Sequence, residues 1–260
     1  MNGFEHGIDH VGHNGFAPLL VIGGAIRESD FHERDLEKIE GVVITDRGLL
    51  KNTTWSDLNL KLLGERLKTL KYLSVEFSGK VDLSEFGLQR NMLHVKLHCP
   101  KLANLSGKIF PELIEAELSV PDSALMSLSP LTIKKLSLIR PKLKDFVVLE
   151  DYKALKTLDV YYARKVLSLH GLLNLLELDW LGLHDCPSFI SIGAKHAMPG
   201  PTELMLGGCG RFSDFSNLEY LSKLRKVSLF GKGPSVAIPE YFKNGTVRFD
   251  IRGRDVLCAN

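Results

Sequence analysis

Three histidines near the start of the chain have the spacing of a metal site. His6, His10 and His13 recur at helical intervals, and acidic residues adjoin them. Imidazole and carboxylate groups on one helical face are suitable ligands for a transition metal. Four glycines in the same stretch oppose a helix, because glycine loses the most backbone freedom on ordering. We therefore predict no metal site and interpret residues 1–15 as a mobile polar leader.

A thiol and two imidazoles form a second group that suggests chemistry. Cys99 follows His94 and His98, but we expect the imidazoles to project outward while Cys99 begins a turn. The glycine-rich segments 207–210 and 231–233 do not match the G-x-x-x-x-G-K-[ST] phosphate loop. Neither H-E-x-x-H nor G-x-S-x-G occurs in the chain. We predict no catalytic residue, no cofactor and no enzymatic activity.

The composition excludes several classes of partner. Among 260 residues, 33 are basic and 31 acidic, so the formal net charge is only +2. This balance does not indicate nucleic acid or a membrane surface as the partner. The apolar run 16–26 is too short to span a bilayer and lacks the basic flank of a signal peptide. The four cysteines contain no C-x-x-C pair, which opposes a structural zinc site or a redox dithiol. Because neither a signal peptide nor a membrane span is recognised, we predict a cytoplasmic protein.

A short apolar pattern recurs along most of the chain and must position any functional side chain. Leu178, Leu181, Leu183 and Cys186 have the spacing L-x-x-L-x-L-x-x-C. The two central apolar positions of this frame recur as Leu73/Val75, Val95/Leu97, Ala116/Leu118, Leu136/Leu138, Leu158/Val160, Leu181/Leu183, Leu204/Leu206, Val227/Leu229 and Val247/Phe249. Successive steps are 22, 21, 20, 22, 23, 23, 23 and 20 residues, which indicates a repeat array.

By this pattern, residues 70–251 resemble the leucine-rich repeat family, and residues 39–69 do so weakly. The resemblance implies an α/β solenoid, a curved array of short parallel strands about 4.8 Å apart. Units of 20–23 residues leave room for loops or 3₁₀ turns rather than long helices. We predict a leader and cap with one degenerate repeat over 1–69, and a solenoid of about nine units over 70–260.

Two further expectations concern the cap and the turns. In the cap, runs 16–26 and 42–44 predict strands, and 30–39 and 55–70 predict helices. The family places Asn or Cys in the turn after each strand, and only Cys186 and Cys209 match here. Because these cysteines occupy equivalent positions of adjacent units, we expect two buried free thiols that lie close together.

The residues between the inward apolar positions should form an open sheet face. They combine aromatic side chains, which are enriched in protein interfaces, with charges that set register and exclude wrong partners. In the ninth unit the frame places Thr246, Arg248 and Asp250 outward. The candidate partner-binding residues are Tyr72, His94, Lys96, His98, Glu115, Glu117, Lys135, Asp159, Tyr161, Trp180, His184, Met205 and Phe230.

We predict non-catalytic recognition of another protein through this face. One candidate role is an immunity protein that binds and neutralises a cognate toxin, because some such proteins resemble leucine-rich repeats. A second is an adaptor, a substrate-recognition subunit or an effector of a host pathway. A third is an enzyme whose chemistry the sequence does not reveal.

Overall fold

The computed structural model describes residues 6–9, 19–22, 38–45, 60–67, 69–128, 132–242 and 245–257. The chain divides into two compact units, unit 1 (residues 1–132) and unit 2 (residues 133–260). The predicted boundary between cap and solenoid, at 69/70, lies inside unit 1. Each unit is a parallel-strand solenoid in its own right.

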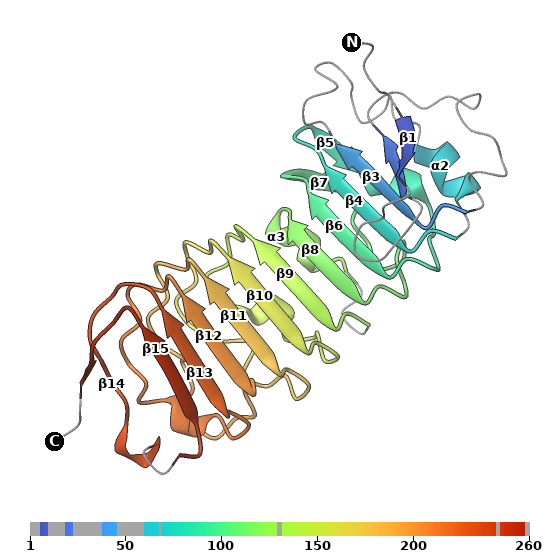
Figure 1. The fold of residues 1–260 in the computed structure, drawn as a ribbon. Coiled ribbons are helices and arrows are strands. Elements are labelled where there is room, and N and C mark those ends of the chain that lie inside the picture. Colours follow the sequence, from blue (N-terminus) through green and yellow to red (C-terminus); the bar gives the residue numbers. More distant parts are fainter. Residues whose placement is uncertain are drawn as a thin grey trace. The chain divides into compact units, whose positions relative to one another are not determined.

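Unit 1 contains a main sheet with the strand order β1-β2-β3-β4-β6-β8 and a small second sheet of β5 and β7 (Figure 1). The β1–β2 pair is antiparallel, and the other neighbours in the main sheet are parallel. Its described strands and helices are β1 (His6–Asp9), β2 (Leu19–Ile22), β3 (Gly41–Thr45), α2 (Leu60–Arg66), β4 (Tyr72–Glu76), β5 (Lys80–Asp82), β6 (His94–His98), β7 (Lys101–Ala103), β8 (Glu115–Ser119) and α3 (Asp122–Leu125).

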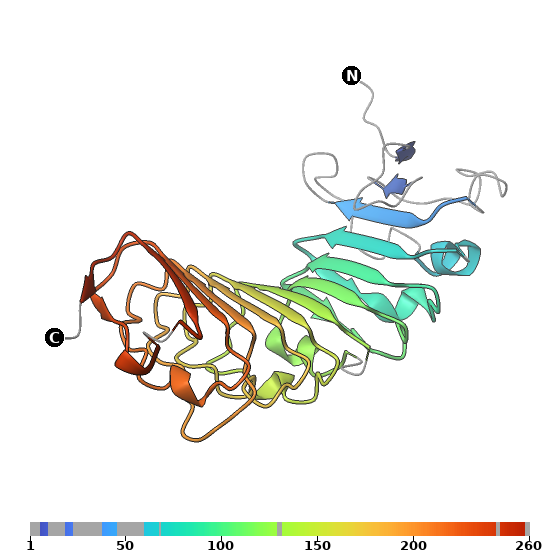
Figure 2. The same ribbon diagram turned by 60° about the horizontal axis from the view of Figure 1, so that its bottom comes forward.

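Unit 2 repeats one strand and one return segment, and its strands are parallel (Figure 1). Its described strands are β9 (Lys135–Ile139), β10 (Thr157–Tyr161), β11 (Trp180–His184), β12 (Glu203–Gly207), β13 (Lys226–Phe230), β14 (Val236–Ala237), β15 (Arg248–Arg252) and β16 (Val256–Leu257). In Figure 2 the return segments lie on one side of the β9–β15 sheet and leave the other side open.

The predicted inward frame is confirmed for the first eight units. Strands such as β6, β8, β10 and β12 alternate between buried and half-buried positions, because successive side chains point to opposite faces. Leu136, Leu158 and Leu181 lie in register on adjacent strands and are 0% exposed. The returns contain short 3₁₀ turns, as expected, at Leu83–Phe86, Val147–Leu149, Leu218–Tyr220 and Glu240–Phe242.

The predicted frame is wrong in the ninth unit. Val227 lies opposite Phe249, not Val247, so the last step is 22 residues rather than 20. The side chains opposite Lys226, Ser228 and Phe230 are therefore Arg248, Asp250 and Arg252, each two residues later than expected. The ninth unit lacks an apolar residue at its first position, so the sequence alone does not define the register of its strand. A parallel ladder defines the register by pairing each backbone group with a neighbouring strand.

The N-terminal region contains more of the ladder than its sequence indicates. The predicted strands within 16–26 and 42–44 are confirmed as β2 and β3, which join the same parallel sheet as β4. Residues 6–9 form β1, so the prediction of a mobile leader is wrong for this segment. Helix α2 confirms residues 60–66 of the predicted helix over 55–70, whereas residues 67, 69 and 70 are not helical. Residues 10–18, 23–37 and 55–59 lie outside the described residues.

The strand exits of unit 2 share a left-handed backbone residue. Each has a positive φ, and most donate their N–H to the last strand residue of the next repeat. These residues are Arg140, Tyr162, Asp185, Gly208, Gly231 and Gly253, with φ values of 54°, 60°, 54°, 66°, 97° and 82°. In unit 1, Phe77 and Cys99 make the same type of hydrogen bond without a positive φ, and their side chains are buried.

Three buried thiols satisfy backbone acceptors next to these exits. The Sγ atoms of Cys99, Cys186 and Cys209 lie 3.6, 3.8 and 3.7 Å from carbonyl oxygens of the preceding strand. Cys186 and Cys209 are free and buried, as predicted for equivalent positions of adjacent repeats. The hydrogen bond with Cys186 and burial raise the pKa of Cys209, so its thiol stays protonated.

The left-handed exits predict two opposite effects on stability. Gly231→Ala places a Cβ at φ 97° and should lower the free energy of unfolding by about 1–2 kcal/mol. Tyr162→Gly relieves a comparable strain but adds about 0.5–1 kcal/mol of backbone entropy cost, so stability should change by less than ~1 kcal/mol. Urea unfolding of both variants measures this. Equal destabilisation by the two changes would contradict the assignment of strain.

Candidate functional site

The structure places the thirteen predicted site residues on the outward positions of β4 to β13. The prediction that Tyr72 presents an exposed side chain is wrong. This residue is 1% exposed, because neighbouring parts of the chain cover it. It cannot contribute an exposed contact. The remaining candidates divide between unit 1 and unit 2 and form two separate groups.

The unit 1 group is a network of charges across β4, β6 and β8. The Nε2 atom of His98 lies 2.8 Å from Oε1 of Glu117, and its Nδ1 lies 3.7 Å from Oε1 of Glu76. Lys96 Nζ contacts the same Glu117 oxygen at 3.0 Å. On the next outward row, His94 Nδ1 lies 3.3 Å from Glu115 Oε2. These side chains pair with one another across the strands, so they stabilise register more than they attract a partner.

Glu117 is the electrostatic centre of this network. The hydrogen bond from His98 is the main cause that lowers its pKa, to about 2, and Lys96 adds to it against the opposing effect of burial. The carboxylate is therefore ionised throughout the neutral and mildly acidic range.

The unit 2 group is centred on Asp159 of β10. Trp180 donates its indole N–H to Oδ1 of Asp159 at 2.9 Å, and His184 Nε2 lies 3.3 Å from the same oxygen. The Tyr161 and His184 rings stack with centroids 4.3 Å apart and an interplanar angle of 14°. Burial opposes ionisation of Asp159, but the hydrogen bonds from His184 and Trp180 outweigh it and lower its pKa. Three ring side chains are thus held in place by one carboxylate.

Gly182 provides the space that this network occupies. It lies opposite Asp159 in the register, between Trp180 and His184 on β11. A Cβ at Gly182 would stand 2.3 Å from Asp159 Oδ1 and 2.8 Å from His184 Nε2. The absent side chain lets both ring residues reach the carboxylate diagonally across the strands.

The other candidates in unit 2 extend this face along β9, β12 and β13. Met205 lies opposite Gly182, and Phe230 lies opposite Gly207. Arg252 stacks its guanidinium 5.5 Å from the Phe230 ring centroid and makes two hydrogen bonds to Asp250. Lys135 contributes positive potential that favours the charged form of Asp159. The resulting face combines aromatic and apolar side chains with the Asp159 carboxylate and with charged residues on the flanking strands.

The arrangement does not assemble the catalytic groups that the sequence suggested. Cys99 is 0% exposed and directs its thiol to the Val75 carbonyl, whereas His98 points outward to Glu117. The thiol–imidazole pair, which the sequence suggests but which we do not predict, is therefore not formed. Within the described part of the chain, no group of three His, Cys, Asp or Glu residues is arranged to hold a metal ion. In the same residues, no helix is long and apolar enough to cross a membrane.

Gly182 and several residues at the strand exits are not among the site residues predicted from the sequence. The misregistered last unit leaves Arg252 outside the expected outward positions, whereas the structure places it opposite Phe230 on β15. Arg140, Tyr162 and Asp185 each directly follow the last residue of a strand, so the alternation of strand residues does not select them. The sequence does contain a signal for these strand-exit residues, because later repeats have glycine at the equivalent positions 208, 231 and 253. Glycine recurring there indicates a left-handed backbone.

The comparisons with known proteins agree with this architecture. Internalin C2 of Listeria monocytogenes has a similar structure, with a TM-score of 0.52 and 19% sequence identity, over 77% of this chain and 84% of that one. A second internalin of the same organism, inlF, has a TM-score of 0.50 and 15% identity over 92% and 82% of the two chains. No family model and no curated protein sequence matches. The fold is a leucine-rich-repeat-like solenoid.

A single methyl group at position 182 should disrupt the Asp159 network. Gly182→Ala forces the carboxylate or the imidazole to move and so breaks a hydrogen bond at Asp159, which costs about 0.5–1.5 kcal/mol. We expect lower stability in urea and a shifted indole N–H resonance for Trp180. Gly207→Ala is the matched control, because its Cβ would meet Met205 Sδ at an ordinary 3.5 Å. Equal effects of both variants would contradict the role of Gly182.

The low pKa of Glu117 predicts an acid transition in unit 1. A carboxyl group with an ordinary pKa of 4.5 and a folded pKa of about 2 stabilises the fold above pH 4.5. This contribution is lost as the pH falls from 4.5 toward about 2. His98→Ala should raise the Glu117 pKa, measured by NMR titration of the side-chain carboxyl. His94→Ala should leave it nearly unchanged, and titration of wild-type Glu117 near 4.5 would refute the network.

Proposed function

We propose that this protein is a non-catalytic protein-binding module that recognises its partner through the open sheet face of unit 2. The aromatic face consists of Tyr161, Trp180, His184, Met205 and Phe230. Parallel sheets usually have both faces covered, so an open face with aromatic side chains favours a binding role.

The observation that supports this proposal most strongly is the Asp159 network. The leucines on the other face of the strands already provide the core, so the solenoid does not require a polar network on its open side. The network instead fixes the orientation of Trp180, His184 and, by stacking, Tyr161. Rings fixed before binding lose less conformational entropy when a partner is bound. Asp159 and His184 side chains are only 17% and 22% exposed, which protects the hydrogen bonds from water.

The unit 1 charges have a different role in this proposal. Lys96, His98 and Glu117 are paired with one another. A partner that used one of these groups would have to compete with the existing pairs. We assign them to register and to the exclusion of unsuitable partners, and the affinity to the aromatic face. Tyr72, being buried, belongs to neither group.

The proposal predicts loss of binding with little loss of stability. The Tyr161→Ala/Trp180→Ala double variant should weaken the affinity for the partner by at least about thirtyfold, because interface anchors contribute ~2 kcal/mol or more. Its melting temperature should fall by only a few degrees, because the core leucines are unchanged and one hydrogen bond to Asp159 is lost. Leu176→Ala/Ile190→Ala is the matched control, because these apolar side chains are 71% and 43% exposed outside the strands.

Affinity capture from a lysate of the source organism, with mass spectrometry, provides the measurement. A protein retained by the wild type and by the control, but lost from the double variant, supports the proposal. A captured toxin would assign the role of an immunity protein, and a component of a host pathway would assign the role of an adaptor. Equal retention by the three proteins would exclude the aromatic face as the binding surface.

A further inference from the structure

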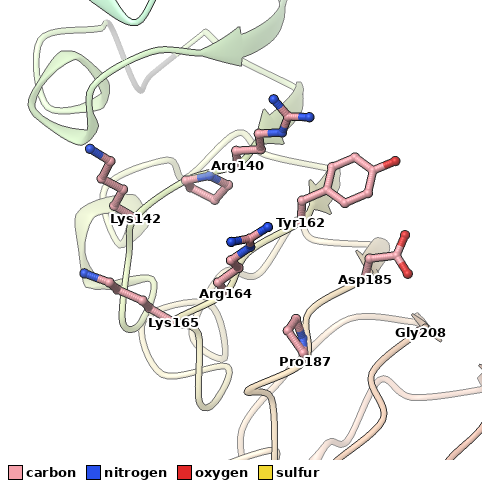
Figure 3. A pocket seen from close by; sticks show the side chains of 9 residues that line it. Arg140, Lys142, Tyr162, Arg164, Lys165, Asp185, Pro187 and Gly208 are labelled. Atoms are coloured by element: carbon pink, nitrogen blue, oxygen red, sulfur yellow. The ribbon is translucent and has the colours of Figure 1, made fainter.

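A groove of about 930 Å³ lies where strands β9 to β12 end in unit 2. Figure 3 shows the side chains that line it, which come from the exits of four adjacent strands. Arg140 follows β9, Tyr162 follows β10, Asp185 follows β11 and Gly208 follows β12. The groove adjoins the aromatic face, because Tyr162 follows Tyr161 and their ring centroids lie 6.5 Å apart. Its lining residues differ from those of the aromatic face, because they follow the strands rather than lie within them.

The left-handed exits direct these side chains into the groove. Arg140, Tyr162 and Asp185 have φ values of 54–60°, where residues other than glycine are strained. Later repeats have glycine at this position, so the fold does not need a side chain there. Gly208 also leaves room for its neighbour, because a Cβ there would stand 2.2 Å from Asp185 Oδ1. Among the described strand exits of unit 2, the three that have a residue other than glycine at this position all line the groove.

The groove carries an excess of positive charge at one end. Arg140, Lys142, Arg164 and Lys165 line it and are exposed, with Asp185 the one carboxylate among the lining residues. In Figure 3 the two lysines lie on the side of the groove away from Asp185. Arg140, Arg164 and Lys165 have no acidic partner within salt-bridge distance among the described residues. These three cations differ from the paired charges of unit 1 because they are available to an anionic ligand.

Apolar surface accompanies the charge. The Tyr162 ring is 48% exposed, and the Arg140 guanidinium stands 5.8 Å from its centroid. Pro141 and Pro187 add rigid apolar walls. A ligand that carries both carboxylates and apolar groups would contact all of these side chains.

We propose that this basic groove binds an extended acidic peptide segment of a partner protein. Adjacent strands lie about 4.8 Å apart, so four exits span roughly 15 Å, the length of about four or five extended residues. Carboxylates of the peptide pair with the guanidinium groups of Arg140 and Arg164, which present two parallel donors each. Asp185 pairs with a basic group of the peptide and thereby sets its direction.

The charge distribution favours a peptide over nucleic acid. Nucleic-acid surfaces follow a regular row of phosphates with a long basic stripe, whereas these cations occupy one short groove. Asp185 would repel a phosphate backbone at the other end of the groove. The formal net charge of +2 for the whole chain adds little nonspecific attraction.

Fluorescence anisotropy tests the proposal with defined probes. The acidic probe is a labelled Glu-Pro repeat peptide, which stays extended in solution. A Lys-Pro repeat peptide and labelled oligodeoxythymidine serve as comparison probes. The test variant is Arg164→Glu/Lys165→Glu, and the matched control is Lys134→Glu/Lys195→Glu, which has the same change of charge at exposed positions of unit 2 outside the groove.

The wild type and the control should bind the Glu-Pro peptide, and the test variant should bind it at least about tenfold more weakly. Binding should also weaken as salt is added. If the test variant fails to fold, Arg164→Gln/Lys165→Gln replaces it. No binding of the acidic peptide, equal losses in test and control variants, or tighter binding of oligodeoxythymidine would each overturn the proposal. None of these variants alters the aromatic face, so failure here leaves the proposed sheet-face function standing.

Discussion

A strand of five residues buries only two inward apolar side chains, so no single repeat of this chain can form a core alone. Each strand depends on its neighbour twice: through backbone hydrogen bonds and through contact of leucines in register, such as Leu136, Leu158 and Leu181. A slip of one residue would turn every side chain to the opposite face. Register is therefore the constraint on which both the core and the outer surface depend.

The same register brings functional side chains together from different repeats. Asp159 receives hydrogen bonds from Trp180 and His184 because the strands align it with Gly182, which leaves the diagonal paths open. In unit 1 the register places Lys96 beside Glu117 and His98 beside Glu76. The chemistry of the outer face thus follows from a core pattern made by other residues. A rigid sheet holds both groups in position before any partner is bound.

The fold was predictable because the inward leucines recur at even intervals, and the outward columns follow from strand alternation. The sequence was ambiguous where that signal failed. Val247 offered a plausible inward residue two positions early, and only pairing with β13 identifies Phe249 as its replacement. Tyr72 occupies an outward position of its strand and is nevertheless buried, so its burial depends on contacts with other parts of the chain. The Asp159 network depends on diagonal contacts, and the exits depend on backbone angles that residue type alone does not determine.

The central claim is that a partner protein contacts the aromatic face of unit 2. Site-specific photo-crosslinking tests it most directly, with benzoylphenylalanine in place of Met205 or, as a reference, in place of the exposed Leu176. Met205 lies on the open face beside Gly182, so irradiation in source cells should join a single protein to position 205 and none to position 176. Cross-links from position 176 alone would contradict the account.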